Sequence, residues 1–234
     1  MCGIVGFLTQ KANEIPPHEA LLGMRDSLVH RGPDDSGEYI RTPGPQGPFV
    51  FLGHRRLSII DLAGGHQPLS NEDGTIWVIF NGEIYNFVEL KRELETLGHR
   101  FASHSDTEVI AHAYEAYGEE CFKRFDGMFA TAIWDDRRHR LVLARDRLGK
   151  KPLYYSLHHD TLVFASELKA IMAYPSFPRR LDSLSLAKYL FFEFIPSPHT
   201  IFEDAFKLPP ATYLVWELGK CEIKEYWSPW SDKE

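Results

Sequence analysis

The sequence is poor in cysteine, and its few cysteines follow no pattern typical of a disulfide framework or a cysteine-based metal site. Cys2, Cys121 and Cys221 are odd in number, lie far apart and include no Cys-X-X-Cys pair. Disulfide-stapled folds belong mostly to oxidising compartments, so this cysteine usage favours a reducing cytoplasm. We expect no disulfide framework and no metal site in this chain.

Long hydrophobic runs and an excess of positive charge are also absent. No stretch of eighteen apolar residues occurs, so no transmembrane helix is expected. The formal net charge of −7 gives no electrostatic footprint for nucleic acid or for an anionic membrane. The N-terminus lacks the basic and apolar regions of a secretory signal. We therefore expect neither nucleic acid nor a membrane as a partner.

What the sequence does contain is many short strand candidates, rich in Val, Ile, Phe and Tyr and bounded by Gly, Asp and Asn. They lie at residues 3–9, 49–61, 75–82, 128–135, 140–146, 152–158 and 161–167, with a final hairpin expected within 211–227. Helix patterns alternate with them at residues 16–32, 86–98, 105–118 and 182–194. Consecutive hairpins with helices between them indicate an α+β fold with mostly antiparallel sheet, not a doubly wound parallel sheet.

Cys2 is the first residue that could carry chemistry. A cysteine in an apolar strand is usually a small buried hydrophobe. Here it directly follows Met1, and the removal of Met1 would give Cys2 a free α-amine. A free α-amine and a thiol have reference pKa values of about 7.7–8.0 and about 8.5, so such an amine could serve as the base for its own thiol. Position alone leaves both interpretations open.

Asn81-Gly82 is the second candidate. An Asn-Gly pair between apolar segments is normally a strong hairpin signal. An amphipathic helix pattern follows it, so we place the pair at a strand-to-helix junction, where glycine would let the backbone approach a ligand. The Gly82 N–H and the Asn81 side-chain amide could then stabilise a developing oxyanion, with Glu83 beside them as a partner for a cation.

Two further positions are ambiguous when taken singly. Asp106 could be a first-turn acid favoured by the helix dipole or a ligand-binding group, in a helix that should begin with a capping box of Ser105 and Glu108. Arg55 and Arg56 alternate faces along a strand, so one of them could grip a carboxylate. A thiol, an oxyanion pair, acids and an arginine together suit a small amino acid with a side-chain carbonyl, such as glutamine.

Eight motifs extend over nearly the whole chain and together carry a family resemblance. They are MCGIVGF (1–7), HRGPDDSG (30–37), LGHRRLSIID (52–61), FNGEIYN (80–86), SDTE (105–108), FDGMFA (125–130), ARDRLGKKPLYY (144–155) and ASELKAI (165–171). With these motifs the chain resembles the glutaminase domain of class II glutamine amidotransferases, which are N-terminal nucleophile hydrolases. Within that class, EIYN and HRRLSIID look like the asparagine synthetase type.

The resemblance implies a four-layer αββα sandwich of two antiparallel sheets and a role for each candidate residue. Cys2 would attack the carboxamide of L-glutamine, and Asn81 with the Gly82 N–H would form the oxyanion hole. The resemblance implies that the substrate would be held by three side chains, with its α-carboxylate on Arg56 and its α-ammonium on Glu83 and Asp106. Ammonia would be released as a cysteinyl thioester forms, and water would then hydrolyse that thioester. It leaves structural roles for HRGPDDSG, as a tight turn around Gly32-Pro33, and for ARDRLGKKPLYY, as a strand pair supporting the core.

One feature of asparagine synthetases is missing from this sequence, an SGGLDS-type pyrophosphate loop in an ATP-dependent C-terminal domain. We expect residues 1–234 to be a single glutaminase domain whose last ~20 residues lead to such a synthetase domain. ATP and Mg²⁺ would belong to that domain, and no cofactor is expected in this chain. Two alternatives remain: the ammonia serves another acceptor, such as a sugar acid, or the domain is an unprocessed structural or regulatory module. Trp227 and Trp230 are expected to offer apolar surface to the missing domain.

Overall fold

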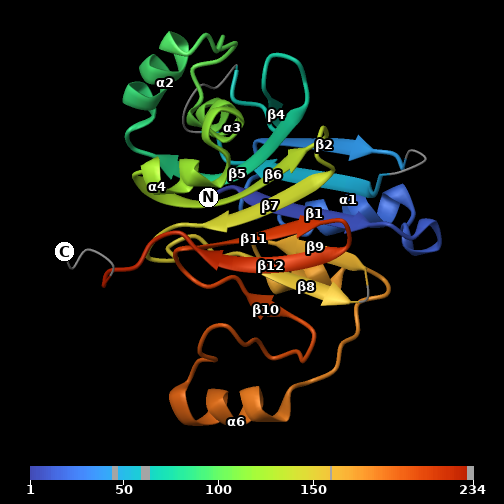
Figure 1. Cartoon of the computed structure of the whole chain (residues 1–234). Helices are drawn as coiled ribbons and strands as arrows, with labels where there is room; N and C mark the ends of the chain where they lie inside the picture. Colours follow the sequence, from blue (N-terminus) through green and yellow to red (C-terminus); the bar gives the residue numbers. More distant parts are fainter. Residues whose placement is uncertain (44–46, 59–63, 159, 231–234) are drawn as a thin grey trace.

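Two six-stranded sheets stacked face to face form the centre of the structure, a computed structural model that describes residues 1–43, 47–58, 64–158 and 160–230 (Figure 1). In spatial order the first sheet contains β10 (Phe206–Lys207), β8 (Tyr154–His158), β9 (Thr161–Ala165), β1 (Gly3–Thr9), β3 (Phe49–Arg56) and β2 (Asp35–Arg41). The second contains β12 (Lys220–Glu225), β11 (Thr212–Glu217), β7 (Arg140–Arg145), β6 (Gly127–Asp135), β5 (Ile76–Ile84) and β4 (Leu69–Ser70). Neighbouring strands run antiparallel in both sheets.

Helices cover the outer face of each sheet. The first sheet carries α1 (His18–Asp26) and α5 (Leu168–Met172), and the second carries α2 (Phe87–Thr96), α3 (Asp106–Tyr117) and α4 (Cys121–Arg124). Two short 3₁₀ turns, η1 (Ala12–Glu14) and η2 (Gly118–Glu120), join these elements. Among the described residues, no helix has the length and apolarity needed to cross a membrane.

Three hydrophobic clusters separate the four layers, and β1 shows how one strand serves two of them. Ile4 and Leu8 point into the cluster between the two sheets. Val5 and Phe7, on the opposite face of the strand, pack in the cluster under α1 and α5. All of β1 is buried, which explains why this strand is continuously apolar instead of alternating with polar residues. The expected α+β sandwich of two antiparallel sheets is confirmed.

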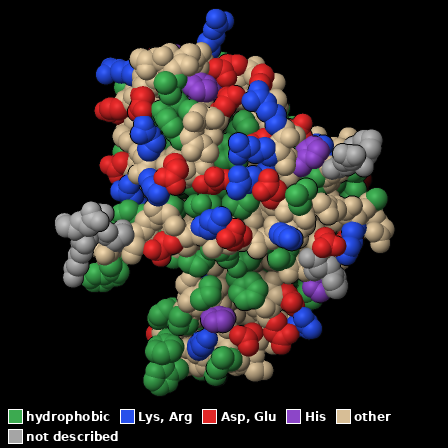
Figure 2. All heavy atoms as spheres, viewed as in Figure 1, with side chains coloured by type: hydrophobic (Ala, Val, Ile, Leu, Met, Phe, Trp, Pro, Cys, Tyr) green, Lys and Arg blue, Asp and Glu red, His purple; other side chains and the backbone are tan. Residues whose placement is uncertain are grey.

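The sixth helix, α6 (Ser183–Phe192), projects away from the four layers (Figure 1). Asp182 is the N-cap of this helix, and its carboxylate accepts hydrogen bonds from the backbone N–H groups of Leu184 and Ser185 at 3.2 Å each. Large apolar side chains remain exposed on and just after it, and Figure 2 shows green surface gathered at this end of the molecule. They are Leu184, Leu186, Tyr189, Leu190, Phe191, Phe192 and Phe194, defined here as the α6 patch.

The first helix is shorter than the pattern over residues 16–32 predicts. It ends at Asp26, and the chain continues in tight turns in which Leu28 N–H bonds the Arg25 carbonyl and Arg31 N–H bonds the Leu28 carbonyl. Leu28 is fully buried under the start of β1. Burial of the Leu28 side chain fixes the course of the chain after the helix. Arg31 therefore lies beside the N-terminal end of β1.

Two strands also differ in extent from the sequence prediction. β3 ends at Arg56, and residues 59–61 of the strand expected over 49–61 lie outside the described residues. β5 continues through Asn81 and Gly82 to Ile84, because it stays paired with β6 along that length. The Asn-Gly pair therefore lies within a strand near its end, and not at a strand-to-helix junction.

Candidate active site

A cavity of about 290 Å³ lies where the start of β1, the last half of β5 and the start of α3 meet. It brings together side chains that are far apart in the sequence. All six residues proposed from the sequence line it: Cys2, Arg56, Asn81, Gly82, Glu83 and Asp106. The wall also contains Met1, Leu57, Gly65, Gln67, Phe80, Ser105, Thr107, Met128 and Lys151.

Cys2 is held at this cavity by its backbone. It directly precedes β1, and its half-buried thiol lies 3.8 Å from the Leu57 carbonyl. Arg31 Nε donates a hydrogen bond to the Cys2 carbonyl at 2.9 Å. One residue into the strand, the Ile4 amide donates to Ser166 Oγ at 3.0 Å. The position of the thiol therefore depends on contacts outside the strand itself.

Arg31 is in turn fixed by Glu167, with Nη1 3.0 Å from Oε1. The same carboxylate also receives His30 Nε2 at 3.0 Å and lies 3.4 Å from Lys169 Nζ. Burial alone would raise the pKa of Glu167, but hydrogen bonds from Arg31 and His30 hold that pKa below its usual value. An ionised Glu167 thus orients the guanidinium that braces Cys2. HRGPDDSG therefore contains a residue that positions the candidate nucleophile, a role the sequence did not reveal.

The free edge of β5 directs its amides at the cavity. Phe80 N–H donates to Gln67 Oε1 at 2.7 Å, and Ile84 N–H donates to Asp106 Oδ2 at 3.1 Å, so both point away from β6. Peptide directions alternate along a strand, and Gly82 lies midway between these two residues. Its N–H therefore points the same way, between Gln67 and Asp106 and into the cavity.

Asn81 supplies a second donor beside this amide. Its side chain is 1% exposed, and its Nδ2 has no hydrogen-bond partner among the described residues. Buried polar groups are nearly always paired, so an unpartnered buried amide facing a cavity suggests a bound partner. The two donors are neutral and preorganised, as an oxyanion site requires.

Gly82 itself is required by the neighbouring strand. A Cβ at this position would lie 2.2 Å from the Met128 carbonyl oxygen and 2.7 Å from Phe129 Cα, both in β6. Any side chain would push β5 and β6 apart and displace the amide that faces the cavity. From the sequence we expected glycine at this position because it lets a ligand approach the backbone. The close contact with β6 is a separate reason for glycine, and the sequence did not predict it.

Arg55 and Arg56 point to opposite sides of β3. Arg56 is buried and lines the cavity. Arg55 instead donates from Nε to the Gly32 carbonyl at 3.0 Å and lies 3.6 Å from Asp26. Gly32 is pressed against this strand so tightly that a Cβ would lie 2.3 Å from the Arg55 carbonyl carbon. Of the two arginines, only Arg56 is in position to meet a ligand in the cavity.

Asp106 and Glu83 make one part of the cavity wall acidic. Burial raises the pKa of Asp106, the Ile84 amide opposes that shift, and the nearby charge of Glu83 raises the pKa further. Two close acids, one of them largely buried, would both be stabilised by a cation placed between them. This electrostatic arrangement suits an ammonium group.

The start of α3 differs from the expected capping box. Ser105 does cap the helix, with its hydroxyl accepting from Thr107 N–H at 3.2 Å. Glu108 turns instead to the preceding loop and accepts from the backbone N–H groups of Ala102 and Ser103 at 2.7 Å each. Burial would raise its pKa, but the His112 ring 3.6 Å away and hydrogen bonds from the Ser103 hydroxyl and these amides lower it to about 2.

Three more residues near the cavity were not singled out from the sequence. Gln67 joins β5 to α3, because its Nε2 donates to Thr107 Oγ1 at 3.1 Å while its Oε1 accepts from Phe80. The fully buried His54 links the two sheets through Nε2 and the Phe80 carbonyl, 3.1 Å apart. Lys151, from ARDRLGKKPLYY, is buried in the cavity wall. Only the motif membership of His54 and Lys151 could have drawn attention to them.

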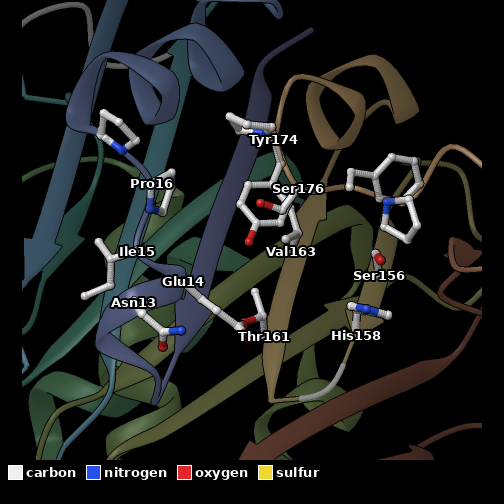
Figure 3. Close-up of a pocket in the computed structure, with 14 residues that line it drawn as sticks. Asn13, Glu14, Ile15, Pro16, Ser156, His158, Thr161, Val163, Tyr174 and Ser176 are labelled. Carbon is white, nitrogen blue, oxygen red and sulfur yellow. The ribbon is translucent and has the colours of Figure 1, made fainter.

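A larger cavity, of about 420 Å³, lies at the other end of β1 and contains none of the six proposed residues (Figure 3). Four prolines, Tyr174 and Phe177 make it largely apolar, and its polar side includes Glu14, whose carboxylate accepts a hydrogen bond from Thr161. Its described lining includes no cysteine and no arginine. The candidate active site is therefore chosen by the chemistry of its lining and not by its size.

Comparison with solved structures agrees with the layer arrangement. The structure is similar to glutamine phosphoribosylpyrophosphate amidotransferase from B. subtilis, with a TM-score of 0.68, 19% identity, and coverage of 96% of this chain and 49% of that chain. An allosteric regulatory enzyme of purine biosynthesis matches equally well, with a TM-score of 0.68 and 21% identity. At these identities the likeness establishes the fold alone, the sandwich of two antiparallel sheets between helical layers.

The chain belongs to the glutamine amidotransferase domain family, whose model matches residues 1–227. It is 42% identical over 229 residues to asparagine synthetase [glutamine-hydrolyzing] 1 of Bacillus subtilis, covering 97% of this chain and 35% of that protein. It is 37% identical over 239 residues to asparagine synthetase [glutamine-hydrolyzing] 3 of the same organism, covering 100% of this chain and 38% of that protein. The chain thus spans little more than a third of these relatives. Its class is that of an amidotransferase enzyme.

Proposed function

We propose that this chain hydrolyses L-glutamine to L-glutamate and ammonia, with Cys2 as the nucleophile. The observation that carries the proposal is that the Cys2 thiol and the unpartnered Asn81 amide line one cavity of about 290 Å³. The amide of Gly82 points into the same space. A nucleophile and two preorganised donors around one small cavity suit acyl transfer from a carboxamide.

The first half-reaction forms a thioester. The Cys2 sulfur attacks the side-chain carboxamide carbon of glutamine, and the carbonyl oxygen becomes an oxyanion held by Asn81 Nδ2 and the Gly82 N–H. When the tetrahedral intermediate collapses, the C–N bond breaks and the nitrogen leaves as ammonia after taking one proton. The Cys2 α-ammonium is the donor of that proton, having first received it from the thiol.

The second half-reaction returns the enzyme to its starting state. Water attacks the thioester carbon while the Cys2 α-amine accepts its proton, and the same oxyanion site holds the second intermediate. Breakage of the C–S bond releases glutamate and restores the thiol. This cycle requires a free amine, so we propose that Met1 is removed. Met1 lines the cavity, and its removal would bring the new amine to the substrate.

Substrate recognition would use the charges around the cavity. Arg56 would bind the α-carboxylate of glutamine through its planar guanidinium. Glu83 and Asp106 would bind the α-ammonium, which places a cation beside a carboxylate whose pKa is already raised. Binding would therefore relieve the repulsion between these two acids.

The test combines intact mass, to establish whether Met1 is removed, with a glutaminase assay. Cys2→Ala should abolish turnover, and the matched control Cys221→Ala should retain it, because Cys221 does not line the cavity. A processed chain that releases no glutamate, alone or joined to its synthetase part, would overturn the proposal. A chain that keeps Met1 and is inactive would support a structural or regulatory module instead.

We further propose that the ammonia serves ATP-dependent asparagine synthesis in the cytoplasm, by a C-terminal synthetase domain that would hold ATP and Mg²⁺. The relatives' names and their greater length support this assignment. The alternative is another acceptor, such as a sugar acid; not every relative is named asparagine synthetase, since one from Gibberella zeae, 33% identical over 249 residues, is named Amidase chry2. The complete gene product, supplied with aspartate, ATP and glutamine, should form asparagine; amidation of a different acid would favour the alternative.

The α6 patch is the surface we assign to that synthetase domain. Its residues Leu190 and Phe191 are 75% and 79% exposed, and exposed apolar side chains gathered in one place commonly mark an interaction site. Of the two tryptophans expected from the sequence to contribute to this surface, Trp230 is 79% exposed. Trp227 instead packs against the hydrophobic cluster under α3. The Arg147 guanidinium lies over the Trp227 ring, with Cζ 5.7 Å from the ring centroid.

A further inference from the structure

Two histidines and two glutamates from three separate segments meet beside α3. Glu72 follows β4, His99 follows α2, and His112 and Glu115 are one turn apart on α3. The ligand atoms of all four lie within 4.8 Å of one another. His99 Nδ1 is 3.7 Å from Glu72 Oε1 and 3.8 Å from Glu115 Oε2, and His112 Nδ1 is 3.4 Å from Glu72 Oε2.

Among the four residues, His112 is the one whose burial the contacts of its own ring do not explain. Its side chain is fully buried, and neither ring nitrogen has a hydrogen-bond partner among the described residues. Phe101 packs edge-on against the ring at 4.4 Å between centroids, and His99 lies at 5.0 Å. A buried imidazole without hydrogen bonds loses its hydration with nothing in return. An ion bound to Nδ1 would remove that cost.

Neighbouring groups contact three of the four side chains and help to orient them. The Arg100 N–H donates to Glu72 Oε1 at 2.6 Å, and Asn71 Nδ2 donates to Glu115 Oε2 at 2.8 Å. Glu115 Oε1 also lies 3.4 Å from Arg137 Nη1. On the far side of His112, Nε2 lies 3.6 Å from Glu108 Oε1. A carboxylate behind a histidine favours the proton on Nε2 and leaves Nδ1 free to bind a metal.

We propose that Glu72, His99, His112 and Glu115 bind one divalent transition-metal ion of the zinc class. Two imidazole nitrogens with two carboxylates favour Zn²⁺ or a similar ion over Ca²⁺ or Mg²⁺, which prefer oxygen ligands alone. Bonds of about 2.0–2.1 Å in a tetrahedron separate ligand atoms by roughly 3.4 Å. The three distances of 3.4–3.8 Å between the atoms here approach that spacing. The competing arrangement is a cluster of histidine–glutamate ion pairs without a metal.

The ion would join three segments, two of which also contribute residues to the active-site cavity. α3 carries both His112 and, at its first residue, Asp106. The segment around β4 carries Glu72 as well as Gln67, which bonds to Thr107. The site is therefore structural: it would hold the second half of α3 against the segments that follow β4 and α2. It is independent of the proposed glutaminase function, and no catalytic step passes through it.

The test titrates ZnCl₂ into chelator-treated chain, with binding measured by calorimetry and bound metal counted by mass spectrometry. The measurements use a Cys2→Ala background, so that zinc cannot bind the candidate nucleophile. We expect one equivalent of zinc and a rise in Tm. His99→Gln and Glu115→Gln, which alter partly exposed side chains, should each weaken binding by at least about 100-fold. The control His18→Gln alters an exposed histidine that also faces a carboxylate, Glu38, and should bind zinc like the parent.

Co²⁺ provides a spectroscopic readout of geometry. A tetrahedral site should give intense visible absorption that His99→Gln removes and His18→Gln retains. Binding of zinc by the His99→Gln and Glu115→Gln variants as tightly as by the parent, or no stoichiometric binding at all, would overturn the proposal. Both outcomes can be observed whether or not the chain hydrolyses glutamine.

Discussion

Arg31 Nε donates a hydrogen bond to the backbone carbonyl of Cys2 at 2.9 Å, across a sequence separation of 29 residues. The same guanidinium is paired with Glu167, so the N-terminal end of β1 is fixed from the side by residues of two other segments. A nucleophile on the second residue of a chain would otherwise be free to fray. This contact makes Arg31 a positioning residue for the proposed reaction.

Replacing Arg31 should therefore slow the chemical step more than it weakens substrate binding. We expect Arg31→Gln to lower kcat by about tenfold or more, since a hydrogen bond to a charged donor contributes about 1.5–3 kcal/mol. KM should change little, because Arg31 does not line the cavity. Arg31→Lys should restore part of the rate, and Arg180→Gln, an exposed arginine paired with Asp204, is the control. An unchanged kcat for Arg31→Gln would exclude this positioning role.

We expect the Asn81 side chain to stabilise the transition state and to contribute little to binding of the substrate. Removing one oxyanion donor typically lowers kcat by about 10²–10³-fold, and we expect that loss for Asn81→Ala with little change in KM. The exposed Asn13, at the other end of β1, provides the control variant Asn13→Ala. Steady-state kinetics with glutamine measure both parameters. A larger effect on KM than on kcat would assign Asn81 to substrate binding instead.

Asp106 should give the glutamine KM a pH dependence. Burial and the Glu83 charge raise the pKa of Asp106, and the Ile84 amide only partly opposes them. As the pH falls through that raised pKa, the carboxylate gains a proton and stops attracting the substrate ammonium, so KM should rise. Asp106→Asn should raise KM by about 10- to 100-fold at neutral pH, as expected for a lost charged hydrogen bond, and should flatten its pH profile.

Two variants control the Asp106 experiment. Asp126→Asn removes an exposed acid outside the cavity and should leave KM unchanged. Glu83→Gln removes the charge that raises the pKa of Asp106, so the remaining rise in KM should move to lower pH. If the KM of the parent stayed constant as the pH fell, a role for ionised Asp106 in binding would be untenable.

His54 should make folding stability depend on pH. Burial lowers its pKa to about 3, and the hydrogen bond to the Phe80 carbonyl opposes that shift only in part. The unfolded histidine titrates near pH 6.5, so below that pH the unfolded state binds a proton that the folded state does not. Stability should fall as the pH drops, by about 2 kcal/mol between pH 7 and pH 5 from this residue.

Urea unfolding at several pH values measures this effect. His54→Gln should have a correspondingly smaller slope of unfolding free energy against pH, whatever its stability at pH 7. His18→Gln, an exposed histidine, should keep the slope of the parent. An NMR titration in which the His54 ring gains its proton near pH 6.5 in the folded chain would contradict the expectation.

The α6 patch should make the isolated chain self-associate. Light scattering should detect dimers or larger species, and the double variant Leu190→Lys, Phe191→Lys should reduce them, because each lysine interrupts the apolar surface. Leu218→Lys is a matched control, since Leu218 is 78% exposed on the turn between β11 and β12. A strictly monomeric parent chain would count against the α6 patch as an interface.

The sequence was most informative about secondary structure and about which reactive or charged side chains the chain carries. Strand and helix patterns predict most elements because the hydrophobic alternation of a half-buried strand or helix is a local property. The candidate site residues were likewise visible as reactive or charged types inside motifs. Their arrangement depends on contacts between residues far apart in the chain, which no local pattern encodes.

The sequence by itself determined that this chain has a cysteine at its second position, an Asn-Gly pair, paired arginines and acids of the right types, within an α+β pattern. Only the tertiary structure decided which arginine faces the cavity, because β3 directs Arg55 toward Gly32 and Arg56 to the other side. It also decided that Arg31 braces Cys2, and that Glu72 and His99 approach α3. Those outcomes follow from sheet register and helix packing, because burial of the three hydrophobic clusters brings together side chains that are distant in the sequence.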